Sequence, residues 1–398
     1  MFEAVGAVIQ RSFYGRAMVG LVASAVLVAW DLGQRDHPPT AAQAAWTVPE
    51  ALSDTAAWVM DGQGLIPMPD NTPSAHASSL VAMPAGRAAV VSAFWFAGSR
   101  ESGPDVQIAA SQFNRAIQQW TPARLVVNRD EMATQLGFGV RRLGNPVAWV
   151  DGQGRLHLFV VGTGLGGWAA ARIVHLRQRT PSSSSSSTLD ANAFEVLRPL
   201  PLSWLWNTSF LVRAPPMALQ DGGMVLPVHF ELGIKYPVAL RFDAQGDFQG
   251  MVRLSRRTHV LQPTLLPVSD GHWLALMRDQ RPEGKITAAE TRDGGRSWTD
   301  LPDLTLDNPD ASVVGLAVAP GQMVLAHNSS WRSRTTLDLS RSSNGTDWTL
   351  IQRLAHGEIP AEFSYPAITW ADGHAWVSYT DRRQKIAWQR FGVPTTSP

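Results

Sequence analysis

Six short units, each an apolar stretch, a turn containing glycine and a second apolar stretch, recur along this chain of 398 residues. Their turn glycines are Gly86, Gly154, Gly223, Gly271, Gly321 and Gly373, spaced 68, 69, 48, 50 and 52 residues apart. Because glycine tolerates the positive φ of tight turns, each unit is predicted to be a β-hairpin. An interval of about 50 residues leaves room for two more strands, and four strands per repeat indicate a propeller blade. The sequence therefore predicts an all-β fold, a six-bladed β-propeller over residues 46–395.

A second motif marks the outer half of a blade. Thr291, Asp293, Gly295, Ser297 and Trp298 form an Asp-box, in which the Asp and hydroxyl side chains bond the turn backbone and the Trp packs between outer strands. Residues 341–348 form a degenerate copy with Ser343 in place of the Asp, and a third copy ends at Trp120. These residues are expected to be structural.

The N-terminal segment has the pattern of a signal sequence. Arg11 and Arg16 precede an apolar run over residues 17–30, which ends at Asp31. A small-residue site, Ala42-Gln43-Ala44, would permit cleavage, although an uncleaved anchor fits the same pattern. Residues 1–45 are therefore predicted to be a signal sequence or signal anchor plus linker. The protein is expected to be exported, either periplasmic or attached to the inner membrane and facing the periplasm.

Charge and cysteine content exclude several functions. The chain has 34 Lys and Arg against 33 Asp and Glu, so no nucleic-acid partner is expected. It has no cysteine, which excludes disulfides, thiolate metal sites and a Cys nucleophile. His229 and Glu231 are only two potential ligands, so neither a metal nor a cofactor is predicted.

Polar residues occur where the inner strands begin and where the second strands end. In an up-and-down blade these two places share one face, so residues from all six blades converge around the central axis. The strand starts are His76, Asn145, Arg213, Gln262, Asp310 and Tyr365. The strand ends are Arg100, Glu101, Asp105, Trp168, His229, Glu231, Arg278, Arg334, Asp381 and Arg382. The pattern predicts a binding site, or a set of charges that pair with one another to close the axis.

The hairpins and Asp-boxes resemble those of the sialidase (neuraminidase) superfamily, and most closely the bacterial predicted-neuraminidase group of BNR-repeat proteins. The resemblance covers residues 70–392. The phrases that carry it begin at His76, Phe94, Gly144, Leu226, Gln262 and Glu362.

This resemblance implies a site with three arginines that bind a substrate carboxylate, an acid/base Asp and a nucleophilic Tyr activated by a Glu. It assigns Arg278 and Arg334 to the second and third arginines. Asp105, five residues after Arg100, matches the acid/base Asp. Three positions depart from the family pattern. His76 stands where the first arginine is expected, Gln262 stands where the activating Glu is expected, and Phe363 stands where the nucleophilic Tyr is expected. Tyr365 is two residues after Phe363, so it is expected on the same side of the strand as a substitute.

Three functions remain open. The first is an exported sialidase-like glycosidase acting on a terminal, acidic sugar of a glycan; the second is a non-catalytic glycan-binding propeller; the third is a scaffold. The candidate catalytic residues are Asp105, His76, Glu101 and Tyr365. The candidate substrate-binding residues are Arg100, Arg213, Gln262, Arg278, Arg334 and Arg382.

Overall fold

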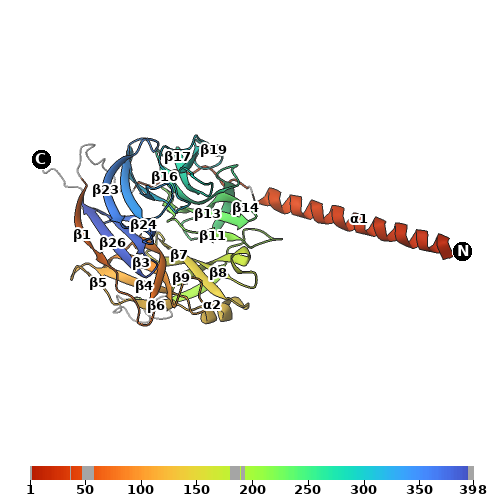
Figure 1. The fold of residues 1–398 in the computed structure, drawn as a ribbon, viewed down its shortest axis with the longest axis horizontal. Helices are drawn as coiled ribbons and strands as arrows, with labels where there is room; N and C mark the ends of the chain where they lie inside the picture. Colours follow the sequence, from red (N-terminus) through yellow and green to blue (C-terminus); the bar gives the residue numbers. More distant parts are fainter. Residues whose placement is uncertain (1, 36, 47–57, 180–188, 190–192, 393–398) are drawn as a thin grey trace.

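The computed structural model describes residues 2–35, 37–46, 58–179, 189 and 193–392. Its strands form six separate antiparallel sheets (Figure 1). The innermost strand of each sheet contacts the innermost strands of the neighbouring sheets, and the last sheet contacts the first. The sheets therefore close into a ring, and the predicted six-bladed β-propeller is confirmed.

The first three blades each begin with one of the predicted hairpins. Blade 1 consists of β2 (Ser74–Ala82), β3 (Ala89–Gly98), β4 (Gln107–Asn114), β5 (Gln119–Trp120) and β6 (Arg124–Val127). A short helix, α2 (Arg129–Leu136), follows it. Blade 2 consists of β7 (Arg142–Val150), β8 (Leu156–Thr163), β9 (Ala171–Gln178) and β10 (Phe194–Pro199). The 3₁₀ turn η1 (Gly167–Ala170) lies between β8 and β9. Blade 3 consists of β11 (Phe210–Val212), β12 (Met217–Ala218), β13 (Met224–Leu232), β14 (Ile234–Phe242) and β15 (Phe248–Arg253).

The last three blades repeat the pattern with shorter connections. Blade 4 consists of β16 (Val260–Pro267), β17 (Trp273–Asp279), β18 (Thr287–Thr291) and β19 (Thr299–Asp300). Blade 5 consists of β20 (Val314–Ala319), β21 (Gln322–Asn328), β22 (Thr336–Ser342) and β23 (Thr349–His356). Blade 6 consists of β24 (Phe363–Ala371), β25 (His374–Asp381), β26 (Lys385–Gly392) and β1 (Val59–Leu65).

Blade 6 joins the two ends of the propeller. Its outermost strand, β1, comes from the N-terminal part of the chain and pairs antiparallel with β26. This pairing closes the ring through main-chain hydrogen bonds, and one of them is donated by Ile66 N–H to the carbonyl of Ile386.

Irregular backbone marks the start of the inner strand in five blades. Ala77, Asn145, Gln262, Asp310 and Tyr365 all have positive φ, which is uncommon for residues with a Cβ. In blades 1, 2, 4 and 6 the pairing register shifts at this point, as in a β-bulge. A bulge re-aims a side chain and ends regular pairing, so it recurs where strands approach a site. The sequence pattern groups His76 with the strand starts Asn145, Gln262, Asp310 and Tyr365. In blade 1, however, the residue with positive φ is Ala77, so His76 lies one residue before the equivalent position.

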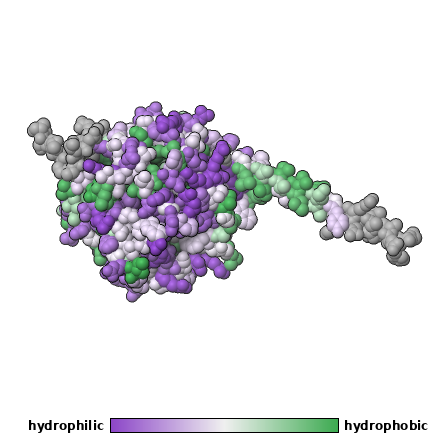
Figure 2. Space-filling model, turned by 45° about the horizontal axis from the view of Figure 1, so that its top comes forward, coloured by the Kyte–Doolittle hydropathy of each residue, from purple (hydrophilic) through white to green (hydrophobic). Residues whose placement is uncertain are grey.

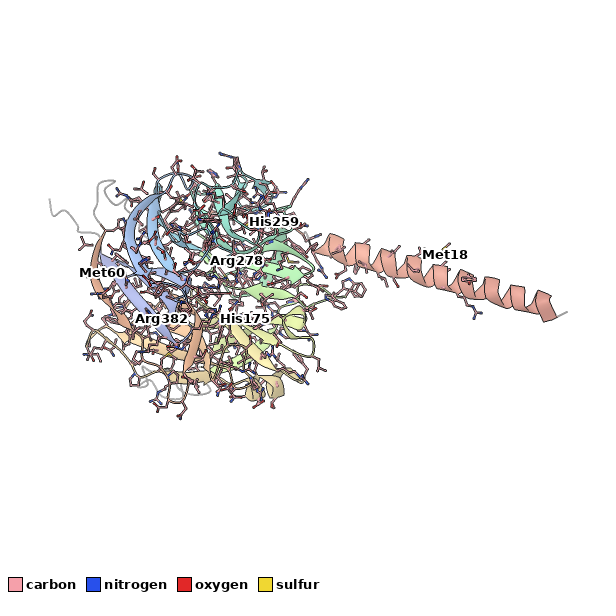
Figure 3. The ribbon with its side chains drawn as sticks, in the orientation of Figure 1. Met18, Met60, His175, His259, Arg278 and Arg382 are labelled. Carbon is pink, nitrogen blue, oxygen red and sulfur yellow. The ribbon has the colours of Figure 1, made fainter. Side chains whose placement is uncertain are left out.

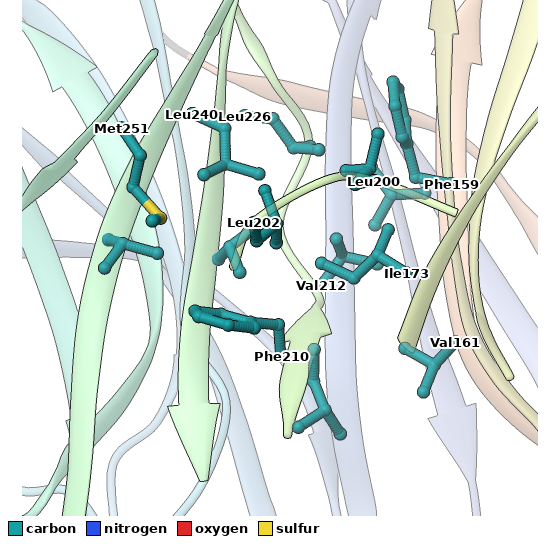
Figure 4. Packing of buried hydrophobic residues seen from close by; sticks show 14 of the residues in the cluster. Phe159, Val161, Ile173, Leu200, Leu202, Phe210, Val212, Leu226, Leu240 and Met251 are labelled. Carbon is teal, nitrogen blue, oxygen red and sulfur yellow. The ribbon is translucent and has the colours of Figure 1, made fainter. Parts of the chain in front are cut away.

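Apolar side chains fill the space between neighbouring blades. One cluster joins blades 2 and 3 and includes Phe159, Phe210 and Leu240 (Figure 4). Tryptophan side chains fill other parts of the core, and Trp95, Trp273 and Trp376 are among the largest fully buried side chains. Burial of a large apolar side chain contributes about 2–3 kcal/mol, so these interblade layers hold the ring together.

The Asp-box of blade 4 has the predicted hydrogen bonds. The Asp293 carboxylate accepts hydrogen bonds from the N–H groups of Arg296 and Ser297 and from the Ser297 hydroxyl, at 2.6–3.0 Å. In blade 5 the prediction is wrong by one residue, because Asn344, not Ser343, takes the place of the Asp. The Asn344 side chain accepts from the N–H groups of Thr346 and Asp347, each at 2.9 Å. This turn is one residue shorter than a full Asp-box.

The N-terminal helix α1 (Phe2–Gln34) projects away from the propeller (Figure 1). Figure 2 shows its apolar surface beyond the body of the molecule. Over Tyr14–Gln34 it is long and apolar enough to cross a membrane. Residues 37–45 then run along blades 3 and 4, where Ala44 is fully buried and its N–H donates to the carbonyl of Asp270.

Candidate functional site

Eight residues from blades 4, 5, 6 and 1 contact one another in succession around the axis. We call this set the axial ring. In order of contact, its members are Tyr365, His76, Glu101, Arg383, Glu362, Arg334, Asp310 and Arg278. They occupy the starts of inner strands and the ends of second strands, which is the face that the sequence pattern predicts.

Glu362 is the central carboxylate of the axial ring. It precedes β24 and accepts hydrogen bonds from Arg334 Nη1 at 3.1 Å, Arg383 Nε at 2.8 Å and Ser364 Oγ at 2.9 Å. Burial by itself raises the pKa of Glu362, but the hydrogen bonds from Arg383 and Ser364 and the charge of Arg334 lower it to about 2. Glu362 is therefore ionised at neutral pH and fixes two guanidinium groups from different blades.

Arg278 forms the part of the axial ring that belongs to blade 4. Its Nε donates to Asp310 at 2.6 Å, and its Nη1 donates to Gln262 at 3.1 Å. Burial lowers the pKa of Arg278, but the hydrogen bond to Asp310 and the nearby Tyr365 side chain raise it above its usual value. Figure 3 places Arg278 toward the middle of the ring of blades. Asp310 also accepts, through its main-chain carbonyl, a hydrogen bond from Arg334.

His76 is the most deeply buried member of the axial ring, with 1% of its surface exposed. Its ring centroid lies 4.3 Å from that of Tyr365, and its Nε2 lies 3.9 Å from the Glu101 carboxylate. Neither ring nitrogen has a hydrogen-bond partner among the residues that the structure describes. Burial and the charge of Arg383 lower the pKa of His76 to about 3, so the imidazole is neutral at physiological pH. An unpartnered buried imidazole is a feature of functional sites.

Arg213 reaches from blade 3 to blades 1 and 6. It follows β11 in blade 3 and donates hydrogen bonds to the carbonyls of Ser78 in blade 1, at 3.1 Å, and Pro366 in blade 6, at 2.6 Å. Its guanidinium lies 5.0 Å from the Tyr365 ring centroid, which is within cation–π distance. Burial lowers the pKa of Arg213 to about 10. Arg213 thus links three blades and packs against Tyr365.

Five of the candidate residues are not members of the axial ring: Arg213 and Gln262, described above, and Asp105, Arg100 and Arg382. Asp105 is exposed and accepts hydrogen bonds from the N–H and hydroxyl of Ser99, at 2.7 and 2.9 Å. Burial by itself raises the pKa of Asp105, but the hydrogen bonds from Ser99 together outweigh this effect and lower it. Arg100 is exposed in the same turn. The Arg382 side chain is 63% exposed and lies 3.8 Å from Asp381.

Two expected positions in blade 6 need correction. Phe363 is buried in the core between blades 5 and 6. Tyr365, with φ of 52°, lies in the bulge that follows and contacts the axial ring. The two side chains therefore do not share a face of the strand, because the bulge breaks the two-residue alternation. Tyr365, and not Phe363, is the aromatic side chain that reaches the axial ring.

Sequence reasoning missed two members of the axial ring as site residues. Glu362 lies in one of the phrases that carry the family resemblance, and its position three residues before Tyr365 was the available signal. Arg383 follows Arg382 and turns inward where Arg382 turns outward. Its carbonyl accepts a hydrogen bond from the N–H of Ala75, which places its guanidinium beside the start of β2. Arg383 therefore supplies a third arginine near the strand where His76 replaces the expected one.

The arrangement of blades and strands is that of the sialidase propeller. The chain is similar to Hadza microbial sialidase Hz136, at 16% identity and a TM-score of 0.63, over 81% of this chain and 66% of that one. It is also similar to Trypanosoma rangeli sialidase, solved in complex with the inhibitor DANA, at 13% identity and a TM-score of 0.64, over 85% of this chain and 60% of that one. The chain thus spans less than two thirds of the length of either enzyme.

A third similar structure is a protein of unknown function from Dyadobacter fermentans, at 11% identity and a TM-score of 0.63. The match covers 85% of this chain and 100% of that one. No curated protein matches the sequence significantly. The model of the BNR repeat-like domain matches residues 90–378. The chain therefore belongs to the BNR repeat-like domain family.

Proposed function

We propose that the protein is an exported glycoside hydrolase that acts on a terminal, acidic sugar of a glycan, with Tyr365 as its nucleophile. The observation that carries the proposal is the position of Tyr365 in the axial ring, with its ring centroid 4.3 Å from that of His76 and 5.0 Å from the guanidinium of Arg213. The apolar stretch of helix α1 that follows Arg11 and Arg16 supports export with the propeller on the far side of the membrane.

The arginines of the axial ring suit an anionic sugar. Arg278, Arg334 and Arg383 come from three blades and are fixed by Asp310 and Glu362. Each guanidinium has five N–H donors in a planar fork, and a fork of this kind matches the two oxygens of a carboxylate. Arg278 and Arg334 each use two nitrogens in the hydrogen bonds described above, so donors remain for a substrate carboxylate.

Tyr365 can attack the anomeric carbon of such a sugar. A neutral phenol avoids the repulsion that a carboxylate nucleophile would meet from the substrate's own carboxylate. The new bond joins the tyrosine oxygen to the anomeric carbon, the bond from that carbon to the leaving oxygen breaks, and the phenolic proton passes to His76. Burial and the charge of Arg383 lower the pKa of His76 to about 3, so the imidazole does not keep this proton but passes it to the Glu101 carboxylate, 3.9 Å from Nε2.

Glu101 is the acid/base residue in this proposal. It lies 3.9 Å from His76, whereas Asp105 is held in its turn by Ser99. Glu101, ion-paired with Arg383, would receive the phenolic proton through His76 and donate it to the leaving oxygen in the first step. In the second step it would accept a proton from the water that releases the sugar, and His76 would return this proton to Tyr365. The hydrogen bonds that lower the pKa of Asp105 make that residue a poorer proton donor.

The test is hydrolysis of a panel of aryl glycosides, including sialosides and uronides, by the full chain in detergent. We expect Tyr365→Phe to lower kcat/KM by at least about 10³-fold. Tyr379→Phe is the matched control, because Tyr379 is buried in the core of blade 6 and donates to the carbonyl of Leu354. Hydrolysis of no glycoside by the wild-type chain, together with calorimetric binding of an acidic sugar, would show a binding protein instead.

A further inference from the structure

The end of helix α1 is built into the propeller. Asp31 is almost fully buried and accepts hydrogen bonds from the Ser203 hydroxyl at 2.7 Å and from the N–H of Leu205 at 3.3 Å. Arg35 Nε donates to the same carboxylate at 2.9 Å. Without α1, the hydroxyl of Ser203 and the N–H of Leu205 would lose this acceptor, so the helix and the propeller are fitted to each other.

Large apolar side chains surround the point where α1 leaves the propeller. We call this surface the collar, and it consists of Trp30, Leu32, Trp204, Leu205 and Trp206. Trp30 and Trp204 pack edge to face, with ring centroids 5.2 Å apart. Trp204 and Trp206 are each 54% exposed, and the other three are also exposed. The surface is therefore apolar, continuous with the helix and open to its surroundings.

The helix that leads into the collar has the properties of a membrane span. Tyr14–Gln34 comprises 21 residues, which at 1.5 Å per residue span about 30 Å, the thickness of a bilayer's hydrocarbon core. Its apolar side chains, among them Met18 and Leu21, are exposed. The collar lies at the end of this span, which is the depth at which Trp side chains concentrate at membrane interfaces.

The segment that follows helix α1 is poorly suited to proteolytic cleavage, because it is packed against the propeller. The predicted cleavage site, Ala42-Gln43-Ala44, lies in the strand-like segment along blades 3 and 4. The N–H of Ala42 donates to the carbonyl of Gly294, and the N–H of Gln220 donates to the carbonyl of Gln43. Removal of residues up to Ala44 would strip these contacts and expose the apolar cluster in which Ala44 is buried.

We infer that α1 is retained as a membrane anchor and that the collar is the surface by which the propeller rests in the lipid interface. The bilayer is the occupant because the apolar surface continues without a break into the span. The loop that carries Trp204 leads to Ser209, whose carbonyl accepts from Glu231 N–H and whose hydroxyl donates to Ala169. Both contacts lie on the face of the axial ring. If the proposed function holds, the substrate is a glycan at the membrane surface.

The absence of cysteine allows a direct test. Trp204→Cys, Trp206→Cys and Ile117→Cys each give the full chain a single thiol, which is labelled with nitrobenzoxadiazole. Ile117 is 60% exposed in the β4–β5 turn, at the opposite end of the strands from the axial ring, and serves as the control. The labelled chains are reconstituted in phosphatidylcholine–phosphatidylglycerol vesicles with or without lipids brominated near the headgroup.

We expect brominated lipids to quench the labels at positions 204 and 206 by at least about twofold and to leave the label at position 117 unchanged. Mass spectrometry of the intact membrane-bound protein is expected to find residues 1–34 present. Labels that stay in water at all three positions, or a mature chain that begins after residue 34, would overturn the inference. Aryl glycoside hydrolysis in detergent reports on the proposed function separately, because it needs no bilayer.

Discussion

The outer turns of the blades and the axial ring use similar polar side chains in different ways. In the Asp-box of blade 4, Asp293 bonds only residues within four positions of itself. In the axial ring, Arg383 bonds Glu101, which lies 282 positions away, and Arg213 bonds carbonyls of two other blades. The hydrogen bonds of the Asp293 carboxylate are local, whereas the axial ring is assembled by the closed fold and leaves His76 unpartnered among the described residues. This contrast separates the part of a blade that holds it together from the part available for chemistry.

The largest effect on stability is expected from Arg213→Met. The substitution keeps the apolar stem but removes the donors to two buried carbonyls, so we expect the free energy of unfolding to fall by about 2–5 kcal/mol. Denaturant unfolding monitored by tryptophan fluorescence measures the change. A loss below about 1 kcal/mol would mean that the two carbonyls find other donors, and the link across the axis would then be unimportant.

Acid is expected to destabilise the protein through His76. In the unfolded chain this residue binds a proton below about pH 6.5, whereas in the folded protein it does so only near pH 3. The unfolded state therefore binds more protons in this window, and stability falls as the pH falls through it. At pH 4.5 the expected loss from His76 is about 3 kcal/mol. His76→Asn should flatten the pH dependence by that amount, and an unchanged slope would contradict the buried neutral imidazole.

Asp293→Ala is expected to have a smaller effect. The turn loses the acceptor of its N–H and hydroxyl groups, but these groups are near solvent, so we expect a loss of about 1–2 kcal/mol. Because Asp293 lies outside the axial ring, kcat/KM on any substrate of the panel should not change. A kinetic defect in a variant that folds normally would show that the outer turns and the axial ring are coupled.

The smallest effect is expected from Arg382→Met, which is the surface counterpart of Arg213→Met. The Arg382 side chain is mostly exposed and lies 3.8 Å from Asp381, so the change in unfolding free energy should stay within about 0.5 kcal/mol. The same unfolding experiment measures it. A large loss here would indicate that exposed arginines matter as much as the buried one, and the contrast between the two regions would fail.

The contrast also explains what the sequence could predict. Hairpins and Asp-box turns depend on residues close together in the chain, so glycine spacing and the Asp293 motif were sufficient to locate the blades. The Asp-box pattern assigns the place of the Asp to Ser343, and the structure has Asn344 there, because the turn is one residue shorter and its register changes. The sequence pattern also predicts Arg382, and not Arg383, as a substrate-binding residue. Only the closed ring determines which of two adjacent arginines turns inward. The link between Glu101 and Arg383 joins the first and last blades, and no local pattern reveals it.

The pairing of β1 with β26 has a consequence for biosynthesis. Blade 6 needs one strand from the start of the propeller and three from its end, so β1 emerges from the ribosome long before its partner exists. Until then, its unpaired main-chain groups are an open edge of the kind that promotes aggregation. If the chain crosses a membrane unfolded, the ring can close only after residues 385–392 have reached the far side. Completion of translocation, rather than synthesis of any one blade, would then be the event that yields a folded protein.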